Sequence, residues 1–266
     1  MTFSISGKTA IVTGAANGIG LAIARNFADR GANVMCADMD EKGLEAEVGA
    51  AVEDSNLRYF AGDLRQRLTI ANLLSATIDA FDRVDILINA SRQVIESDPL
   101  DPDDTSIEVM WEQNLMTAYR LTQQVAKRMI KQGKDQEDGQ LGSIVNLSSI
   151  AAHQTRPELL GYSIASAGLE QMTRGLALSL APHRIRVNAV AFGSVMSASL
   201  QASLQDNPDW RSEIEEATPL HRIASPTELV DAVQFLASEG SGFVTGDVMT
   251  IDGGRSLLDP VDAPAH

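Results

Sequence analysis

Three glycines near the start of the chain have a spacing that suggests phosphate binding. Gly14, Gly18 and Gly20 lie in "TGAANGIG", between an apolar run and a segment of helical period. Glycines let the backbone approach a pyrophosphate closely, and the free N–H groups of a following helix favour negative charge. The spacing G-x-x-x-G-x-G differs from the most familiar dinucleotide fingerprint. Its place in the first strand–turn–helix unit favours a nucleotide site over the alternative, a plain tight turn.

Asp38, at the end of the second apolar run, indicates which nucleotide is bound. A carboxylate at this place accepts hydrogen bonds from an adenosine ribose and repels a 2′-phosphate. Met39 follows, and the glycine loop contains no Arg or Lys that would bind such a phosphate. The sequence therefore favours NAD(H) over NADP(H), with an ordinary strand-end aspartate as the alternative.

A tyrosine and a serine farther along the chain have the chemistry for proton exchange. Tyr162 lies in "GYSIASAGLE", and Ser149 lies thirteen residues earlier, in "IVNLSSIAA". A phenol can exchange a proton with an alcohol or carbonyl oxygen, and a serine hydroxyl can polarise the same oxygen. A free phenol ionises only at about pH 10, so a base at neutral pH needs a positive charge nearby.

These motifs, in this order, resemble the short-chain dehydrogenase/reductase family over almost the full length of the chain. "GDL" (Gly62–Leu64), "RVNAVAFG" (Arg186–Gly193) and "TGDVMTIDGG" (Thr245–Gly254) add to the resemblance. It implies a Rossmann-like, doubly wound parallel sheet in a three-layer α/β/α sandwich. It also implies NAD(H)-dependent interconversion of a secondary alcohol and a ketone.

The resemblance assigns roles to individual residues. Ser149 would orient the carbonyl oxygen, Tyr162 would exchange its proton, and Asn114 would support a water-based proton relay. Relatives are commonly homodimers or homotetramers packed through two long helices, and the same is expected here. The implied cofactor-binding residues are Gly14, Asn17, Gly18, Ile19, Gly20, Asp38, Asp63, Leu64, Asn89, Ala90, Tyr162, Gly193, Val195 and Ser197.

Three departures from the family pattern all fall on the nicotinamide side of the expected site. Ser166 stands where the family has the lysine that lowers the pKa of its tyrosine, and no lysine follows Lys134. The family's Asn-Asn-Ala-Gly segment places Arg92 at the glycine position if aligned without a gap, or Ser91 with one. Phe192 replaces a proline.

Two functions are compatible with these departures. In the first, the chain is a working dehydrogenase in which Arg92 supplies the missing charge, or in which the positive NAD⁺ ring suffices. In the second, it is a catalytically impaired NAD-binding or scaffold protein. A further alternative is that Ser166 was introduced artificially. The substrate itself cannot be inferred: His153, Gln154 and "SVMSASLQ" are pocket candidates, and a solvated loop is the alternative for His153.

Composition limits the other classes of function. A net charge of −15 argues against nucleic acid or an anionic membrane as the main partner. Cys36 is the only cysteine, which excludes an internal disulfide, and His183 and His221 form no recognisable metal site. We expect no signal peptide, no membrane span, no metal and a cytoplasmic location.

The 266 residues fit one α/β domain, 1–266, in which strands and helices alternate. A lid over the substrate is expected at 194–218, with a packed helical excursion as the alternative, and an exposed loop is expected at Lys131–Gln140. The expected strands are Thr9–Thr13, Asn33–Ala37, Leu57–Ala61, Asp85–Asn89, Gly142–Leu147, Arg186–Val190 and Val248–Ile251. The expected helices are Ile19–Arg30, Glu41–Glu53, Gln66–Phe81, Ser106–Lys131, Leu160–Leu180 and Thr227–Ala237.

Overall fold

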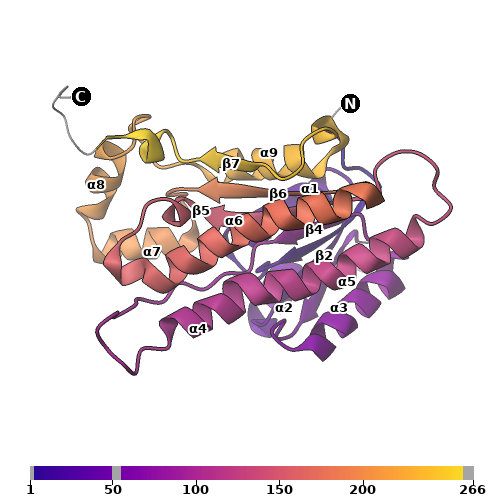
Figure 1. The fold of residues 1–266 in the computed structure, drawn as a ribbon, viewed down its shortest axis with the longest axis horizontal. Coiled ribbons are helices and arrows are strands. Elements are labelled where there is room, and N and C mark those ends of the chain that lie inside the picture. Colours follow the sequence, from indigo (N-terminus) through magenta and orange to yellow (C-terminus); the bar gives the residue numbers. More distant parts are fainter. Residues whose placement is uncertain (1–2, 50–54, 260–266) are drawn as a thin grey trace.

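A computed structural model describes residues 3–49 and 55–259 of the chain, and Figure 1 shows its arrangement. Seven strands form one parallel sheet in the order β3-β2-β1-β4-β5-β6-β7. The order reverses at β1, and in such sheets ligands bind where the carboxyl ends of the strands diverge. The strands are β1 (Thr9–Thr13), β2 (Asn33–Asp38), β3 (Leu57–Ala61), β4 (Ile86–Asn89), β5 (Gly142–Ser149), β6 (Ile185–Phe192) and β7 (Val248–Ile251).

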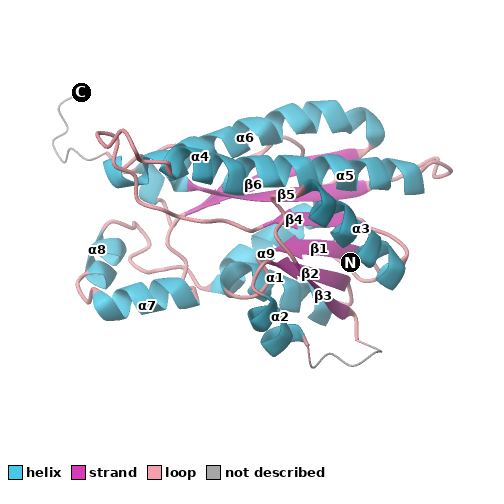
Figure 2. Ribbon diagram, turned by 90° about the horizontal axis from the view of Figure 1, so that it is seen from below, coloured by secondary structure: helices cyan, strands magenta, loops and turns pink. Residues whose placement is uncertain are grey.

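Helices cover both faces of the sheet, which confirms the expected Rossmann-like three-layer architecture (Figure 2). One apolar core packs α1, α2 and α9 against the sheet, and the other packs α3, α5 and the end of α6. The helices are α1 (Gly18–Asp29), α2 (Glu41–Val48), α3 (Arg67–Phe81), α4 (Ser106–Met110), α5 (Thr117–Gln132), α6 (Leu160–Leu180), α7 (Ala198–Asp206), α8 (Trp210–Glu216) and α9 (Pro226–Ala237).

The central strands are longer than the sequence pattern predicts. β5 and β6 each have eight residues, all buried, and they pair in parallel along their whole length. The prediction ended β5 too early because the polar "SS" resembles the start of a loop. Both serines instead lie in the strand, at its buried carboxyl end. Part of the predicted helix Glu41–Glu53 falls outside the described residues, and the described part ends at Val48.

The long helix predicted over Ser106–Lys131 is interrupted. A π-helical segment, Trp111–Met116, separates α4 from α5. Thr117 donates its side-chain hydrogen bond to the Glu112 carbonyl, five residues earlier, as this wider turn allows. Such insertions into α-helices are frequent at functional sites.

The segment expected to be a lid contains two short helices. α7 and α8 stand apart from the sheet layers in Figure 2. A single parallel bridge between Val195 and Ala224 ties the beginning of the segment to the chain that follows it. Whether the segment closes over a substrate stays a prediction.

Candidate active site

The turn between β1 and α1 has a backbone shape that favours glycine. Gly14 and Gly18 have φ angles of 66° and 56°, in the left-handed region. At Gly20 the reason is space, because a Cβ there would lie 2.1 Å from the Gly14 carbonyl oxygen. The side chain of Asn17 forms no capping hydrogen bond, so the first N–H groups of α1 remain available to an anion. The turn therefore fits a pyrophosphate.

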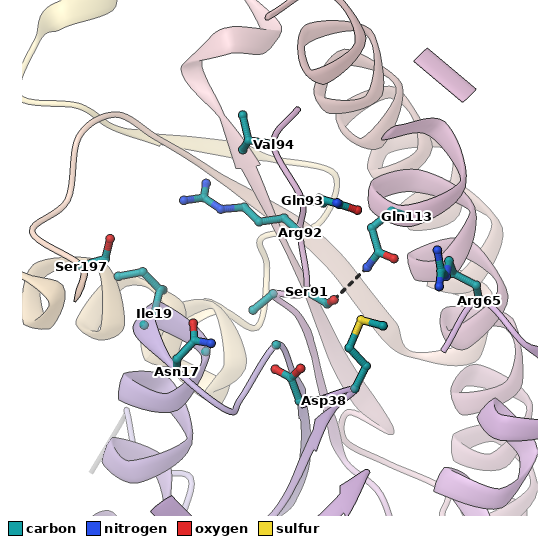
Figure 3. A pocket seen from close by; sticks show the side chains of 15 residues that line it. Asn17, Ile19, Asp38, Arg65, Ser91, Arg92, Gln93, Val94, Gln113 and Ser197 are labelled. Atoms are coloured by element: carbon teal, nitrogen blue, oxygen red, sulfur yellow. Dashed lines mark hydrogen bonds between the residues drawn. The ribbon is translucent and has the colours of Figure 1, made fainter. Parts of the chain in front are cut away.

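A cleft of about 620 Å³ opens from this turn along the carboxyl ends of the strands (Figure 3). Its volume is within the range of small-molecule and cofactor sites. The remaining predicted cofactor residues line three adjoining recesses. The predicted residues that line the main cleft are Gly14, Asn17, Gly18, Ile19, Gly20, Asp38, Ala90 and Ser197.

Asp38 ends β2 and faces the cleft with a fixed carboxylate (Figure 3). One carboxylate oxygen accepts a hydrogen bond from the Ala16 N–H at 3.1 Å, and the other accepts one from the Asp40 N–H at 3.1 Å. A carboxylate offers about four acceptor positions, so further hydroxyl groups can bind. This arrangement suits a ribose diol.

Beside Asp38 a small recess contains Asp63 and Leu64, and the contact of Asp63 with an adenine stays a prediction. Arg65 donates from Nε and from its terminal nitrogen to the two Asp63 carboxylate oxygens, at 2.9 and 2.8 Å. This pairing holds the pKa of Asp63 below its usual range. Arg65 also lines the main cleft, and the sequence analysis missed it. The available signal was a basic residue two places after a site aspartate.

The chain that follows β4 is anchored to β1. The Thr13 hydroxyl accepts hydrogen bonds from the backbone N–H groups of Ala90 and Ser91, both at 3.0 Å. The Asn89 side chain instead donates to Asn146 at 2.8 Å, inside the sheet. Ala90 therefore lines the cleft. The Asn89 side-chain amide instead joins β4 to β5.

Arg92 and Tyr162 meet at the far end of the cleft. The Arg92 guanidinium donates a hydrogen bond to the Tyr162 hydroxyl oxygen at 3.1 Å. Its central carbon also lies 4.6 Å from the centroid of the Phe192 ring, within the range of a cation–π contact. Tyr162 is buried, with 7% of its surface exposed. The nearest cation to this phenol is therefore an arginine from another element.

Ser166 lies one turn after Tyr162 on α6 and is also buried. A cavity of about 10 Å³ adjoins both side chains, with Arg92 and Asn114 also in its lining. That volume is close to the minimum for one water molecule. Ser166 and Arg92 therefore share the lining of one small cavity.

Ser149 is the last residue of β5 and is paired in register with Phe192 of β6. Its hydroxyl oxygen accepts a hydrogen bond from the Ala151 N–H at 3.1 Å. The hydroxyl proton remains free to be donated to another acceptor. Gly193, Val195 and Ser197 follow β6 and line a recess that also contains Arg92, and their contacts with the cofactor stay a prediction.

Asn114 uses its side chain to hold the backbone of Gln93. Its amide oxygen accepts from the Gln93 N–H and its amide nitrogen donates to the Gln93 carbonyl, both at 2.8 Å. The π-helical segment places Asn114 opposite this loop. Asn114 therefore fixes the backbone of Gln93, the residue after Arg92. The part of Asn114 in a proton relay stays a prediction.

His153 is engaged by a buried carboxylate that the sequence analysis missed. Its Nε2 lies 3.0 Å from Oε2 of Glu170, which is 2% exposed. The Ser148 hydroxyl donates to Glu170 at 3.1 Å, and Arg174 lies 3.8 Å from it. Gln154 donates a 3.5 Å hydrogen bond to the Arg255 carbonyl. His153 is thus a solvated loop histidine, about half exposed, whose ring also contacts Glu170.

Two general features concern the whole described chain. Over residues 3–49 and 55–259, no group of three or more His, Cys, Asp or Glu side chains is arranged to hold a metal ion. No helix in the same ranges has the length and apolar character needed to cross a membrane.

Comparison with known proteins agrees with this geometry. A family model described as enoyl-(acyl carrier protein) reductase matches residues 14–256. The short-chain dehydrogenase anuF of Penicillium roqueforti is 32% identical, over 97% of this chain and 98% of its own. L-rhamnose 1-dehydrogenase (NAD(P)(+)) of a Sphingomonas species is 31% identical, over 94% and 96%.

A solved structure of 7α-hydroxysteroid dehydrogenase, complexed with NADH and 7-oxo glycochenodeoxycholic acid, has a TM-score of 0.86 to this fold. It is 28% identical, and the match covers 95% of this chain and 96% of that one. The glycine turn, the sheet order and these matches lead to one conclusion: the chain belongs to the short-chain dehydrogenase/reductase family of oxidoreductases.

Proposed function

We propose that this chain is an NAD(H)-dependent oxidoreductase that interconverts a secondary alcohol and a ketone. The observation that carries the proposal is the continuous cleft from the glycine turn and Asp38 to the loop whose Arg92 holds the Tyr162 hydroxyl. A nicotinamide bound there supplies the hydride acceptor or donor for the reacting carbon. The side chains of the protein then have two tasks, which are to bind the nucleotide and to transfer one proton to or from the substrate oxygen.

The cofactor end has the groups that NAD(H) requires. The first turn of α1 receives the pyrophosphate through its free N–H groups, and Asp38 accepts hydrogen bonds from the adenosine ribose. The negative charge of the same carboxylate repels the 2′-phosphate of NADP(H). The structure has no cation in the glycine turn to offset it, and Arg65 is already paired with Asp63.

At the other end, Ser149 and Tyr162 handle the substrate oxygen. Ser149 donates its hydroxyl hydrogen to that oxygen and fixes its position, since its own oxygen is already bound to the Ala151 N–H. During oxidation the Tyr162 oxygen accepts the alcohol proton, and during reduction it returns a proton to the new alkoxide. Asn114 positions the loop that carries Arg92.

The proposal is tested with panels of secondary alcohols with NAD⁺ and of ketones with NADH, followed by the absorbance of NADH. Turnover that Tyr162→Phe removes, with NAD⁺ binding retained, supports it. Tight NAD⁺ binding without turnover on broad panels favours the alternative of a nucleotide-binding protein with impaired chemistry. Turnover that survives Tyr162→Phe would contradict the assigned proton path.

We also propose a homodimer or homotetramer packed through α5 and α6. Leu178 and Ile164 expose 80% and 38% of their surface on α6, and Trp111 exposes 44% just before α5. Exposed apolar residues along adjacent helices suit a self-complementary contact. Sedimentation velocity would give a monomer mass if this is wrong.

A further inference from the structure

The three departures from the family pattern meet at a single point in the structure. Arg92 donates to the Tyr162 hydroxyl, stacks on the Phe192 ring, and shares the lining of one small cavity with Ser166. These residues come from the loop after β4, the end of β6 and the first turns of α6. In sequence they are far apart, so their contact is a property of the folded chain.

The position of Arg92 is supported from two sides. The Asn114 side chain forms hydrogen bonds of 2.8 Å with both the N–H and the carbonyl of Gln93, the residue after Arg92. The Phe192 ring supports the guanidinium plane at 4.6 Å. A proline at position 192 would have no aromatic ring for the guanidinium to stack on. Phe192 and Arg92 are therefore complementary.

The charge of Arg92 is not neutralised by an acid. Within residues 3–49 and 55–259, Arg92 takes part in no ion pair. Tyr162 packs in an apolar cluster with Met110, Ala151 and Ala165, and the buried polar side chains Asn114 and Ser166, which share a cavity with it, are uncharged. The charged group on α6 nearest in sequence, Glu170, already pairs with His153 and Arg174. The guanidinium is thus the charged group in hydrogen-bond contact with the phenol oxygen.

We propose that Arg92 takes over the electrostatic role that a lysine at position 166 has in the relatives. Its guanidinium stabilises the phenolate form of Tyr162, so that the phenolate oxygen can accept the proton of a bound alcohol. In the reverse direction the phenol gives this proton to the alkoxide, and Arg92 stabilises the phenolate that remains. This inference rests on the proposed alcohol–ketone chemistry.

The packing also predicts that lysine and arginine exclude each other here. Arg92 and Ser166 line the same small cavity, so a lysine side chain at position 166 would extend into the space beside the Arg92 guanidinium. Ser166→Lys alone must displace Arg92 or place two cations side by side. The double variant Ser166→Lys/Arg92→Gly removes this conflict and recreates the arrangement of the relatives.

The first test needs neither substrate nor cofactor. The chain has three tyrosines, Tyr59, Tyr119 and Tyr162, and their phenolate absorbance can be titrated with base. Tyr162→Phe identifies the transition that belongs to this residue. Arg92→Gln should move that transition to higher pH, because the phenolate loses the guanidinium that donates to its oxygen.

The matched control is Arg156→Gln, which removes the same charge from an exposed position in the loop before α6. It should leave the transition where it is. Thermal unfolding of each variant shows that the fold is intact. An unmoved transition in a folded Arg92→Gln protein, or an equal shift in Arg156→Gln, would overturn the inference.

The second test uses a substrate found by the panel. Arg92→Gln should lower kcat/KM for alcohol oxidation at least tenfold near neutral pH, and raising the pH should recover much of this loss. Arg92→Gly should be rescued at least tenfold by adding Ser166→Lys, whereas Ser166→Lys alone should lower activity. If Tyr162→Phe is inactive while Arg92→Gln is fully active, the proposed function stands and the role of Arg92 is wrong.

Discussion

Replacing Asp38 by asparagine should remove the preference for NAD⁺ over NADP⁺ that we propose for this protein. We expect the parent to bind NAD⁺ at least tenfold more tightly than NADP⁺. Each carboxylate oxygen of Asp38 already accepts one backbone N–H, from Ala16 or Asp40, and keeps room for one ribose hydroxyl. The substitution keeps the shape of the side chain but removes its negative charge.

The size of the effect follows from these contacts. A hydrogen bond to a charged acceptor contributes about 1.5–3 kcal/mol, against about 0.5–1.5 kcal/mol for a neutral pair. Two ribose hydrogen bonds that each lose about 1 kcal/mol weaken NAD⁺ binding by about 2 kcal/mol, or roughly thirtyfold. NADP⁺ binding should weaken less or improve, because the repulsion between the carboxylate and the 2′-phosphate is gone.

Isothermal titration calorimetry with each nucleotide measures both affinities without any substrate. Asp40→Asn is the matched control, since Asp40 caps α2 by accepting from the Gly43 N–H at 3.0 Å and does not line the cleft. It should alter thermal stability and leave the ratio of the two affinities unchanged. The reasoning is refuted if the parent binds both nucleotides equally, or if Asp38→Asn preserves the ratio.

Four further substitutions test the glycine turn and the supports of the fold. Gly20→Ala forces the glycine turn apart and should weaken NAD⁺ binding at least tenfold in calorimetry, whereas Gly175→Ala, with no atom within 4 Å of its new Cβ, should stabilise α6 by up to about 1 kcal/mol. Glu170→Ala should cost about 2 kcal/mol in urea unfolding, because it opens a cavity and leaves the buried Ser148 hydroxyl without its carboxylate acceptor; an unchanged midpoint would contradict this. Hydrogen bonds from Arg222 lower the pKa of Glu228 from 4.5 to about 2, so the stability that Glu228→Gln removes should be full above about pH 4.5 and vanish as the pH falls to about 2. Because Glu228 is exposed, the loss at pH 7 should stay below about 1 kcal/mol; an equal loss at both pH values would be the contrary result.

The sequence predicted which residues of the glycine turn and β2 lie together at the cleft, because the signals there are local. Gly14, Gly18 and Gly20 mark a turn by residue type alone, and Asp38 marks the end of the strand that follows. Each of them lines the cleft in the structure. In such places the backbone conformation and the function depend on residues that are neighbours in the chain.

The redox end could be predicted only in part, because its contacts join distant segments. The alignment left open whether Arg92 or Ser91 occupies the family's glycine position, and only the fold brings Arg92 to Tyr162. Glu170 fits the polar pattern of a solvated helix face, and its burial depends on packing against β5. The π-helical segment at Trp111–Met116 has no composition signal that separates it from an α-helix.

The reversal of strand order at β1 divides the cleft between two stretches of the chain. The glycine turn, Asp38 and Asp63 come from β1 to β3, and the proposed redox groups come from the segments that follow β4, β5 and β6. Ser166 and Phe192 do not line the main cleft, so substitutions there leave the glycine turn and Asp38 unchanged. With this arrangement, the residues that transfer the proton can change during evolution while selection separately maintains the affinity for the cofactor. It also lets a protein engineer exchange the coenzyme through one half without redesigning the other.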